Sequence, residues 1–559
     1  MQLTHPQKLA VQTTDKDLCI IACPGAGKTR VVVARILHLL KTKQAKPHNI
    51  VAITYTRKAG EELCSRIFRS AKNFKNLDEM FVGTIHSYAL RLLDGYQLLE
   101  PARLHLFIEK HGLNKQYDVS AFIEAMSVIS ETPQSKPTRK IMRLYQEYRQ
   151  TMLDNGYVDF SLILRMAYEQ LLTDEVLRSQ IAENLKFLMV DEYQDVNPIQ
   201  ELMIKELHSL GANLCTVGDD EQTIYQWRGS QPQNILQFAR RYQGSVEIRL
   251  EDNFRSTQGI IYMVKTFSDK TMNAASGLVF EKGDIVCRDF GTNDDEANFI
   301  AAKSADIIAG GVCPSEIAVL CRTRRIMADI AFAFEAKGVP CVQEDAKGFF
   351  RDDDIENLCE CFFYLNKTFP YMSQQYYRDE FFNKRVLDYL DGVDLDGDEL
   401  SLSDIYFGIF KIIKKPHETF LQVIDDFESI YDDTQPPREK LTLFCKFLER
   451  GARDKYENPQ PKKSQPAAVR IMTAHSAKGL EFHAVFVPGL NRGYFPYYKS
   501  KTNEERKLFY VAITRAKKIL VLTRSRQKRG RHYRAIASPF FKGVKKYLDK
   551  NSISNKIKA

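Results

Sequence analysis

The most constraining feature of this sequence is a glycine loop between an expected strand and an expected helix near its beginning. Leu18–Ala22 (LCIIA) is a short apolar run of the kind that forms a buried parallel strand. Residues 23–29 (CPGAGKT) follow, and residues 30–40 then have a helix-like pattern. A strand, a glycine loop, Lys-Thr and a helix in this order predict a phosphate-binding loop in an α/β fold.

The residue types of this loop fit a nucleoside triphosphate with Mg²⁺. Glycines let backbone N–H groups turn toward phosphate oxygens, and the helix N-terminus adds a favourable dipole. Lys28 can reach the β- and γ-phosphates, and the hydroxyl of Thr29 can bind Mg²⁺. Ala22 stands where the consensus has its first glycine. On this motif alone a glycine turn without a ligand remains the alternative. The residues expected around the nucleotide here are Cys23, Pro24, Gly25, Ala26, Gly27, Lys28, Thr29 and Arg30.

A second buried-strand pattern ends in an acidic pair. Phe187–Val190 (FLMV) is followed directly by Asp191 and Glu192. A carboxylate at the C-terminal end of a parallel strand lies at the ligand edge of such a sheet. We therefore expect Asp191 to hold Mg²⁺ and Glu192 to orient or deprotonate the attacking water. The alternative for an isolated Asp-Glu pair is a helix cap or a solvated turn.

Length and charge bound the remaining possibilities. At about 150 residues per domain, 559 residues predict three or four domains. The formal net charge of +9 is mild, so it permits a polyanionic partner without requiring one. Residues 523–534 are strongly basic, whereas residues 391–399 and 425–433 are acidic. Either set of charges is equally well explained as a solvated loop.

Several classes of protein are disfavoured by residues that are scattered or missing. The 11 cysteines include no CxxC pair, and no HExxH motif occurs, so a zinc ribbon, an iron–sulfur site or a disulfide scaffold is not expected. No apolar run approaches the roughly 20 residues of a membrane span, and no signal peptide is expected. We therefore expect a cytoplasmic protein without a membrane partner.

Further motifs follow in a fixed order along the chain, and together they resemble superfamily 1A DNA helicases, the UvrD/Rep/PcrA group. The resemblance weakens at about residues 94–156 and 366–465. The motifs that carry it are LTHPQ (3–7), AITYTRKAGEEL (52–63), GTIHS (83–87), DEYQDVNPIQ (191–200), VGDDEQTIYQWRGS (217–230), EDNFRST (251–257), TAHSAKGLEF (473–482) and YVAITRAKK (510–518).

The resemblance implies roles for residues around the base and ribose of ATP. Gln7 is similar to the glutamine that reads the adenine edge, and Arg35 matches an arginine that packs on one adenine face. Phe254 stands where the family usually has a tyrosine on the other face, so stacking is kept and a hydroxyl is lost. Glu481 matches an acid that contacts the ribose.

The resemblance also implies three residues near the γ-phosphate. Gln222 is similar to a residue that senses this group, and Arg255 and Arg515 resemble two arginines that reach it from across a cleft. Phosphoryl transfer develops negative charge that a donated arginine stabilises. Because these arginines are far from Lys28 in sequence, two domains must close on one nucleotide, and hydrolysis must open them. For each arginine taken alone, a surface salt bridge is the alternative.

Aromatic residues beside cations suit single-stranded nucleic acid, since every base offers a face for stacking. Core packing is the alternative for each aromatic residue, and RNA is not excluded as the polymer. The resemblance implies that the strand path is formed by Tyr55, Tyr225 and Trp227, with His86 and His475 close to it. We add the neighbouring cations Arg57 and Arg228, and the basic residues 523–534 as a salt-sensitive phosphate grip.

The resemblance implies two RecA-like cores with parallel sheets, each interrupted by a mostly helical insertion. The expected parts are 1–89 and 185–258 for the first core, 90–184 for its insertion, 259–365 and 466–545 for the second core, 366–465 for a compact acidic insertion, and 546–559 for a basic tail.

The function implied is ATP- and Mg²⁺-dependent 3′→5′ movement on single-stranded DNA, with unwinding of tailed duplex DNA. The alternative is a subunit that senses DNA ends or nucleotides and licenses a nuclease, as in compact UvrD-like components of anti-phage systems such as the Gabija helicase subunit. The acidic insertion favours this alternative, because an acidic face is a poor site for duplex phosphates. A nuclease or repair protein is the partner that it implies.

Overall fold

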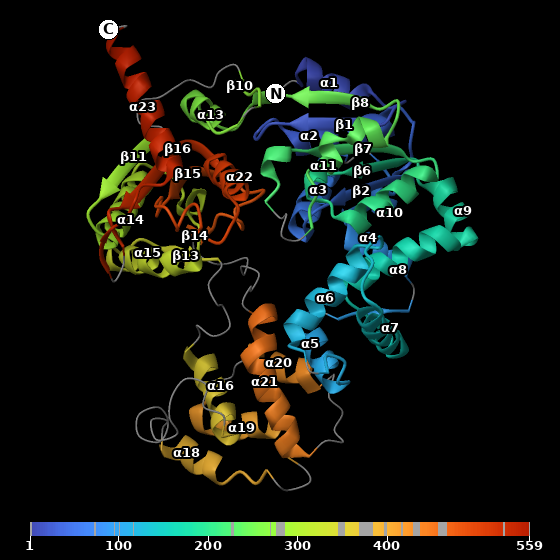
Figure 1. Cartoon of the computed structure of the whole chain (residues 1–559), viewed down its shortest axis with the longest axis vertical. Coiled ribbons are helices and arrows are strands. Elements are labelled where there is room, and N and C mark those ends of the chain that lie inside the picture. The colour runs from blue at the N-terminus through green and yellow to red at the C-terminus, as the bar shows by residue number, and fades with distance from the viewer. Residues whose placement is uncertain are drawn as a thin grey trace.

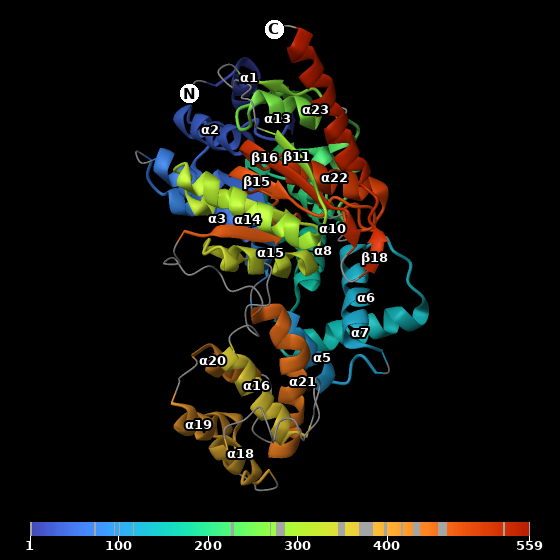
Figure 2. The ribbon, with the colours of Figure 1, turned by 90° about the vertical axis from the view of Figure 1, so that its left-hand side faces the viewer.

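The molecule consists of two α/β bodies side by side and a helical body at one end (Figure 1). The computed structural model describes residues 3–71, 74–93, 95–99, 101–115, 117–224, 229–268, 270–275, 285–344, 353–367, 384–395, 400–414, 418–428, 436–456, 467–528 and 531–557. A view turned by 90° places both chain termini at the end opposite the helical body (Figure 2).

The first α/β body is built on a six-stranded sheet in the order β3-β2-β6-β7-β1-β8, with every pairing parallel. All residues of β1, β2 and β6 are buried. Such continuous apolar strands are typical of a parallel sheet covered by helices on both faces. The strands are β1 (Leu18–Ala22), β2 (Ile50–Thr54), β3 (Phe81–Thr84), β6 (Phe187–Val190), β7 (Asn213–Gly218) and β8 (Val246–Leu250); the helices beside them include α1 (His5–Gln12), α2 (Lys28–Lys41), α3 (Arg57–Ser70), α4 (Ile85–Leu92) and α10 (Pro198–Ser209).

The second α/β body has the same layered design. Its six strands lie in the order β11-β16-β15-β12-β14-β13 and are also all parallel. The predicted fold class, α/β with two parallel-sheet cores, is therefore confirmed. The elements are β11 (Ile285–Phe290), β12 (Ile317–Cys321), β13 (Cys341–Gln343), β14 (Val469–Thr473), β15 (Phe482–Val487) and β16 (Ala516–Ser525), with α14 (Asn293–Ala309), α15 (Arg324–Ala336), α22 (Thr502–Ile513) and α23 (Pro539–Ile557).

A first group of helices lies between β3 and β6 in the chain. Its apolar residues form one continuous cluster with Cys19, Ile21 and Val51 of the first sheet, so these helices have no separate core. Asp159 caps α8 by accepting from the backbone N–H of Leu162 (2.6 Å). The helices are α5 (Pro101–Lys110), α6 (Val119–Glu131), α7 (Arg139–Asp154), α8 (Phe160–Thr173) and α9 (Glu175–Asn184).

The helical body at the end of the molecule has its own core, rich in phenylalanine. The Phe362 ring lies 5.1 Å from that of Phe444 and 5.5 Å from that of Phe420. Phe362 is on α16, so this helix packs in the helical body. The expected boundary at residue 365 had placed it in the second α/β core instead. The helices are α16 (Asp353–Leu365), α18 (Lys384–Asp391), α19 (Leu402–Ile413), α20 (Glu418–Glu428) and α21 (Pro437–Tyr456); α21 lies against α5 (Figure 1).

The basic tail expected from residue 546 is also placed differently. Residues 546–557 continue α23, which begins at Pro539 and packs its Phe540 ring flat against Phe509, 4.6 Å away. The expected boundary thus falls inside a helix, because the sequence signal there is charge and not a helix end. Over the part of the chain that the structure describes, no helix has the length and apolar character needed to cross a membrane.

Candidate nucleotide site between the two cores

The phosphate loop has the backbone that its glycines predict. Gly25 and Gly27 have φ angles of +72° and +80°, a region that side chains disfavour, and Gly27 is the N-cap of α2. The segment after β8 holds the loop from outside. The Asn253 side-chain amide donates to the Pro24 carbonyl (2.7 Å), and the Phe254 N–H donates to the Gly25 carbonyl (2.9 Å). Gly25 thus sits where two segments approach closely.

Lys28 and the acidic pair meet at the carboxyl edge of the first sheet. Lys28 Nζ lies 3.1 Å from Glu192 Oε1. Burial opposes the charge of Lys28, but Glu192, Asp191 and Asp219 raise its pKa above the usual value. Burial and the neighbouring Glu192 carboxylate raise the pKa of Asp191, whereas Lys28 and Lys478 lower that of Glu192 in spite of burial. Glu192 is ionised and has a φ of +52°, a conformation that marks a strained functional position.

A chain of hydrogen bonds leads from Glu192 to the opposite core. The Gln194 amide donates to Glu192 Oε2 (2.5 Å), and its carbonyl accepts from the Asp219 N–H (2.9 Å). Asp219 Oδ2 accepts from the Gln222 amide (2.8 Å), whose oxygen accepts from Arg515 Nη2 (2.9 Å). Gln222 and Arg515 were expected at the γ-phosphate. Gln194 and Asp219 were missed, although they lie within the DEYQD and GDDEQ motifs.

Arg515 carries a buried charge that lacks a carboxylate. It is 2% exposed and donates to the Val511 and Leu480 carbonyls and the Thr514 hydroxyl, besides Gln222. No carboxylate of the described residues forms an ion pair with it. Burial and, secondly, Arg255 lower the pKa of Arg515, but an arginine in a protein stays protonated. The site therefore holds a fixed cation whose natural partner is an anion.

Arg255 and Glu481 come from opposite cores and contact each other. Arg255 Nε lies 2.7 Å from Glu481 Oε2, and Lys517 Nζ lies 3.0 Å from the other carboxylate oxygen. Burial alone would raise the pKa of Glu481, but Arg255 and Lys517 lower it, so Glu481 is ionised. Both side chains were expected at the nucleotide, and the structure brings them together beside the phosphate loop.

Three further cations of the second core reach the first. Lys478 pairs with Asp195 and donates to the Gln222 carbonyl (2.7 Å). Lys507 donates to the Asp220 carbonyl (2.8 Å), and Arg506 lies 3.0 Å from Glu221 Oε2. The cores are thus closed on one another around the site. Sequence reasoning did not predict these contacts, which include the ion pairs Lys478–Asp195 and Arg506–Glu221 between the two cores.

Gln7 and Arg35, both expected at the adenine, are buried and hydrogen-bonded within the first core. Gln7 is 1% exposed; its amide donates to the Ala26 carbonyl (3.0 Å) and its oxygen accepts from the Thr4 N–H (3.1 Å). Arg35 is fully buried and donates to the carbonyls of Ala10 and Thr13 and to Asn213. Arg35 therefore holds α1, and its expected contact with an adenine face stays a prediction.

Three half-buried side chains lie beside or within the loop: Thr29, Arg30 and Phe254. Arg30 lies in the first turn of α2, where its Cβ is 3.8 Å from the position of a Cβ on Gly27. Phe254 is half-buried and is fixed by its backbone bond to Gly25. Thr29, the second residue of α2, is also half-buried. A base placed here would have Arg30 as a nearby cation.

The donor set fits a magnesium nucleotide. Mg²⁺ prefers oxygen ligands and is usually held by one or two protein groups together with phosphates. Asp191 and Thr29 supply such oxygens next to Lys28. The Arg515 guanidinium, which lacks a carboxylate partner among the described residues, and the glycine loop at the N-terminus of α2 match a bound polyphosphate.

The candidate nucleic-acid residues lie at the carboxyl edges of both sheets. Tyr55 follows β2 and is half-buried, and His86 is in the first turn of α4, directly after the neighbouring strand β3. Burial lowers the pKa of His86 to about 4, and its ring packs 5.6 Å from that of Phe160. Arg57 is exposed and lies 3.3 Å from Glu61, while His475 follows β14 in the second core.

Four residues or segments expected at the nucleic acid do not contribute to the surface that the structure describes, either because they lie outside the described residues or because they are buried. Tyr225, Trp227 and Arg228 lie outside the described residues. Arg524, at the start of the basic stretch, is 7% exposed in β16 and pairs with Asp289. It is therefore part of the second core and not of a phosphate grip; Arg526, two residues later, is exposed.

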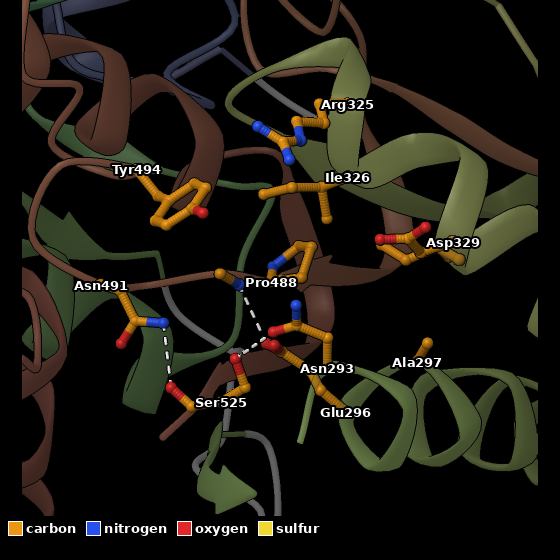
Figure 3. A pocket seen from close by; sticks show the side chains of 12 residues that line it. Asn293, Glu296, Ala297, Arg325, Ile326, Asp329, Pro488, Asn491, Tyr494 and Ser525 are labelled. Carbon is orange, nitrogen blue, oxygen red and sulfur yellow. Dashed lines mark hydrogen bonds between the residues drawn. The ribbon is translucent and has the colours of Figure 1, made fainter. Parts of the chain in front are cut away.

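A separate cavity lies in the second core at the carboxyl ends of β15 and β16, between α14 and α15 (Figure 3). Buried Glu296 accepts from the Gly489 N–H (2.9 Å) and the Thr523 hydroxyl (2.6 Å) at its floor. Tyr494 and Ile326 face the cavity from opposite sides. It is lined by none of the residues expected at the nucleotide or the nucleic acid.

Two parallel-sheet cores closed on a phosphate loop define a P-loop ATPase whose nucleotide site lies between its domains. Family comparison agrees: the UvrD/REP helicase N-terminal domain matches residues 3–119 and 104–243, and the UvrD-like helicase C-terminal domain matches residues 248–376 and 413–527. The chain belongs to the UvrD-like helicases of superfamily 1A.

Full-length relatives support this assignment. The chain is 26% identical to DNA helicase II of Rickettsia typhi, over 94% of this chain and 92% of the relative. It is also 26% identical to the ATP-dependent DNA helicase PcrA of Staphylococcus aureus, over 98% of this chain and 87% of the relative. The similarity thus spans both cores and both helical insertions.

Proposed function

We propose that this chain is an ATP-dependent DNA helicase that moves 3′→5′ on single-stranded DNA and unwinds tailed duplexes. The observation that carries the proposal is the hydrogen-bond chain from Glu192 to Arg515, which joins the acidic pair of one core to an unpaired cation of the other. The names of the relatives, DNA helicase II and ATP-dependent DNA helicase PcrA, support ATP and DNA as its substrates.

We assign hydrolysis to Lys28, Glu192 and Arg515, which are charged in the structure. Lys28 holds Glu192 at 3.1 Å and has a phosphate group as its alternative partner. When Lys28 turns to the β- and γ-phosphates, the pKa of Glu192 rises, because its principal cation has left. Glu192 then accepts the proton of the attacking water. Arg515, with Arg255 beside it, stabilises the charge that develops on the transferred group.

Mg²⁺ held by Thr29 and Asp191 would neutralise phosphate charge at this place. Asp191 is suited to this because its backbone position at the end of β6 is fixed: its N–H donates to the Ile53 carbonyl (2.9 Å). Gln222 lies between Asp219 and Arg515 and so reports whether the two cores are closed. Loss of the γ-phosphate removes the anion that Arg515 and Lys28 share, which favours opening of the cores.

Opening and closing is converted into movement at the sheet edges. Tyr55 and His86 belong to the first core and His475 to the second, so a change in core spacing changes the spacing of these residues. His86 is neutral at physiological pH, since burial lowers its pKa. A neutral ring suits base stacking or a hydrogen bond better than charge pairing with phosphate.

The direction of movement is tested with tailed duplexes. The protein is incubated with ATP and duplexes that carry either a 3′ or a 5′ single-stranded tail of the same length. We expect strand separation with the 3′ tail alone, and none in either case for Lys28→Ala. Unwinding that prefers the 5′ tail contradicts the direction, and equal rates with an RNA tail contradict DNA as the preferred polymer.

A second candidate function is regulation of a nuclease partner, with weak unwinding. It is favoured by the helical insertion, which is compact, has its own core and carries the acidic residues 391–399. An acidic sequence suits a protein partner better than a duplex backbone. Strong unwinding by the isolated chain argues against this candidate, whereas low hydrolysis that rises on addition of a co-purified nuclease supports it. The scattered cysteines suit a reducing cytoplasm in either case.

A further inference from the structure

A short segment of the chain crosses from the second core to the phosphate loop. It begins after α13 (Gln258–Lys265) and includes Phe267. The Phe267 ring lies 5.1 Å from that of Phe509, and the Phe267 carbonyl accepts from Arg506 Nη1 (2.8 Å). It ends in β10 (Asn273–Ala274), which pairs in parallel with β9 (Asp252–Asn253). Asn253 in turn holds the Pro24 carbonyl. Both ends of this crossing segment are therefore fixed, one to each side of the nucleotide site.

Lys270 lies in the middle of the crossing segment and points into the first core. Its ammonium lies 2.6 Å from Asp219 Oδ1 and 2.5 Å from Asp220 Oδ1. The Lys270 side chain is 14% exposed and that of Asp219 is not exposed at all. A fully buried carboxylate is strongly unfavourable without a hydrogen-bonded cation. Burial would raise the pKa of Asp219, but Lys270 and, secondly, Lys28 lower it, so the pair is ionic.

Asp219 uses its second oxygen for Gln222, the residue expected at the γ-phosphate. Asp219 Oδ2 accepts from the Gln222 amide (2.8 Å), and the Gln222 oxygen accepts from Arg515 (2.9 Å). Asp219 Oδ1 accepts from the Glu221 N–H (3.2 Å) as well as from Lys270. The orientation of Gln222 therefore depends on a carboxylate that Lys270 holds in place.

We propose that Lys270 is a positioning residue for ATP hydrolysis, which acts through Asp219 to orient Gln222 toward Arg515. This inference rests on the proposed function. Because the crossing segment is anchored in both cores, Lys270 links their spacing to the geometry around the γ-phosphate. Lys270 pairs with Asp219 and Asp220, and of these two carboxylates Asp219 is the one that accepts from the Gln222 amide, so we expect its influence on the rate to pass through Asp219.

The test compares Lys270→Met, Lys270→Arg, Asp219→Asn and the double variant Lys270→Met/Asp219→Asn in ATP hydrolysis stimulated by oligo-dT. A matched control is Lys265→Met, because Lys265 lies on the preceding helix with its ammonium 5.7 Å from the ring of the exposed Tyr262. The readouts are kcat, KM for ATP, binding of a fluorescent ATP analogue and the thermal midpoint of unfolding.

We expect Lys270→Met to lower kcat by about 100-fold, as a misplacement of roughly 1 Å does, with KM and analogue binding changed less than about threefold. Lys270→Arg should restore most of the rate, since it keeps the cation. The double variant should be no slower than Asp219→Asn alone, because two residues that act through one path are not additive. Lys265→Met should match the wild type.

Three results would overturn this inference: a Lys270→Met rate within about threefold of wild type, losses that multiply in the double variant, or an equal loss in Lys265→Met. If Lys270→Met does not fold, Lys270→Arg and the charge-balanced double variant decide by the same criteria. A wild-type chain without DNA-stimulated turnover refutes the proposed function instead, so the two failures are distinct.

Discussion

Replacing Arg515 by methionine should abolish hydrolysis without destabilising the protein. Arg515 is 2% exposed and makes four hydrogen bonds, all to uncharged acceptors. A buried guanidinium without a carboxylate is worth keeping only if a ligand supplies the anion. The substitution removes that cation and retains most of the apolar volume.

The two expected magnitudes can be worked out separately. An arginine that stabilises the transferred phosphoryl group is worth about 10³–10⁵ in kcat, or about 4–7 kcal/mol at 1.36 kcal/mol per tenfold. For stability, each hydrogen bond from a charged group contributes about 1.5–3 kcal/mol, and burying an unpaired ion costs several kcal/mol. These terms have opposite signs and partly cancel, so the thermal midpoint should move by less than about 5 °C.

Arg524→Met is the matched control, because Arg524 is also buried in the second core but is paired with Asp289. Breaking that pair should cost about 3–5 kcal/mol of stability and leave kcat of the folded fraction within about threefold. The assay is oligo-dT-stimulated ATP hydrolysis with a thermal unfolding scan for each variant. The reasoning is refuted if Arg515→Met keeps more than a tenth of the wild-type rate, or if it lowers the thermal midpoint as much as Arg524→Met.

Three further predictions follow from single contacts. Arg35→Met should lower the free energy of unfolding by about 2–4 kcal/mol and raise KM for ATP, because three hydrogen bonds from Arg35 hold α1, which carries Gln7. An unchanged free energy of unfolding in urea would contradict this. Gly25→Ala should reduce hydrolysis at least about 100-fold, since its Cβ would lie 2.7 Å from Arg255 Cβ at a φ of +72°; an active variant with wild-type KM would show that the segments are not this close. Asp17→Asn should destabilise the protein at pH 7 but hardly at a pH below the lowered pKa of Asp17. Burial raises this pKa, His208 and the Leu214 N–H lower it, and the net shift is downward, so the stability is lost only as pH falls from 3.8 through the lowered value; an equal loss above and below that window in urea unfolding would count against the contact.

Local patterns predicted those parts of the molecule in which one segment determines its own structure. The run Leu18–Ala22 is a strand because five consecutive apolar residues suit a fully buried position. Gly25 and Gly27 have positive φ as a phosphate loop requires. Lys28 meets Glu192 because both follow strands of one parallel sheet, whose carboxyl ends share an edge.

Features that depend on contacts between distant segments were not predictable from local patterns. Arg35 lies on the buried side of α2 and donates its hydrogen bonds to carbonyls at α1, and spacing in the sequence does not reveal these contacts. The role of Lys270 depends on a crossing segment whose ends are fixed by Phe509 and β9. Helix α16 joins the helical insertion because its aromatic residues pack with α20 and α21, and no turn signal marks that choice.

Hydrolysis of ATP between the two cores, coupled to binding of single-stranded DNA, is central to the proposed function. It is tested most directly by ATP hydrolysis with and without oligo-dT, for the wild type and for Glu192→Gln. We predict hydrolysis that oligo-dT strongly stimulates, and a loss of at least about 100-fold in Glu192→Gln with ATP-analogue binding retained. Hydrolysis that oligo-dT leaves unchanged, or that persists in Glu192→Gln, would contradict the account.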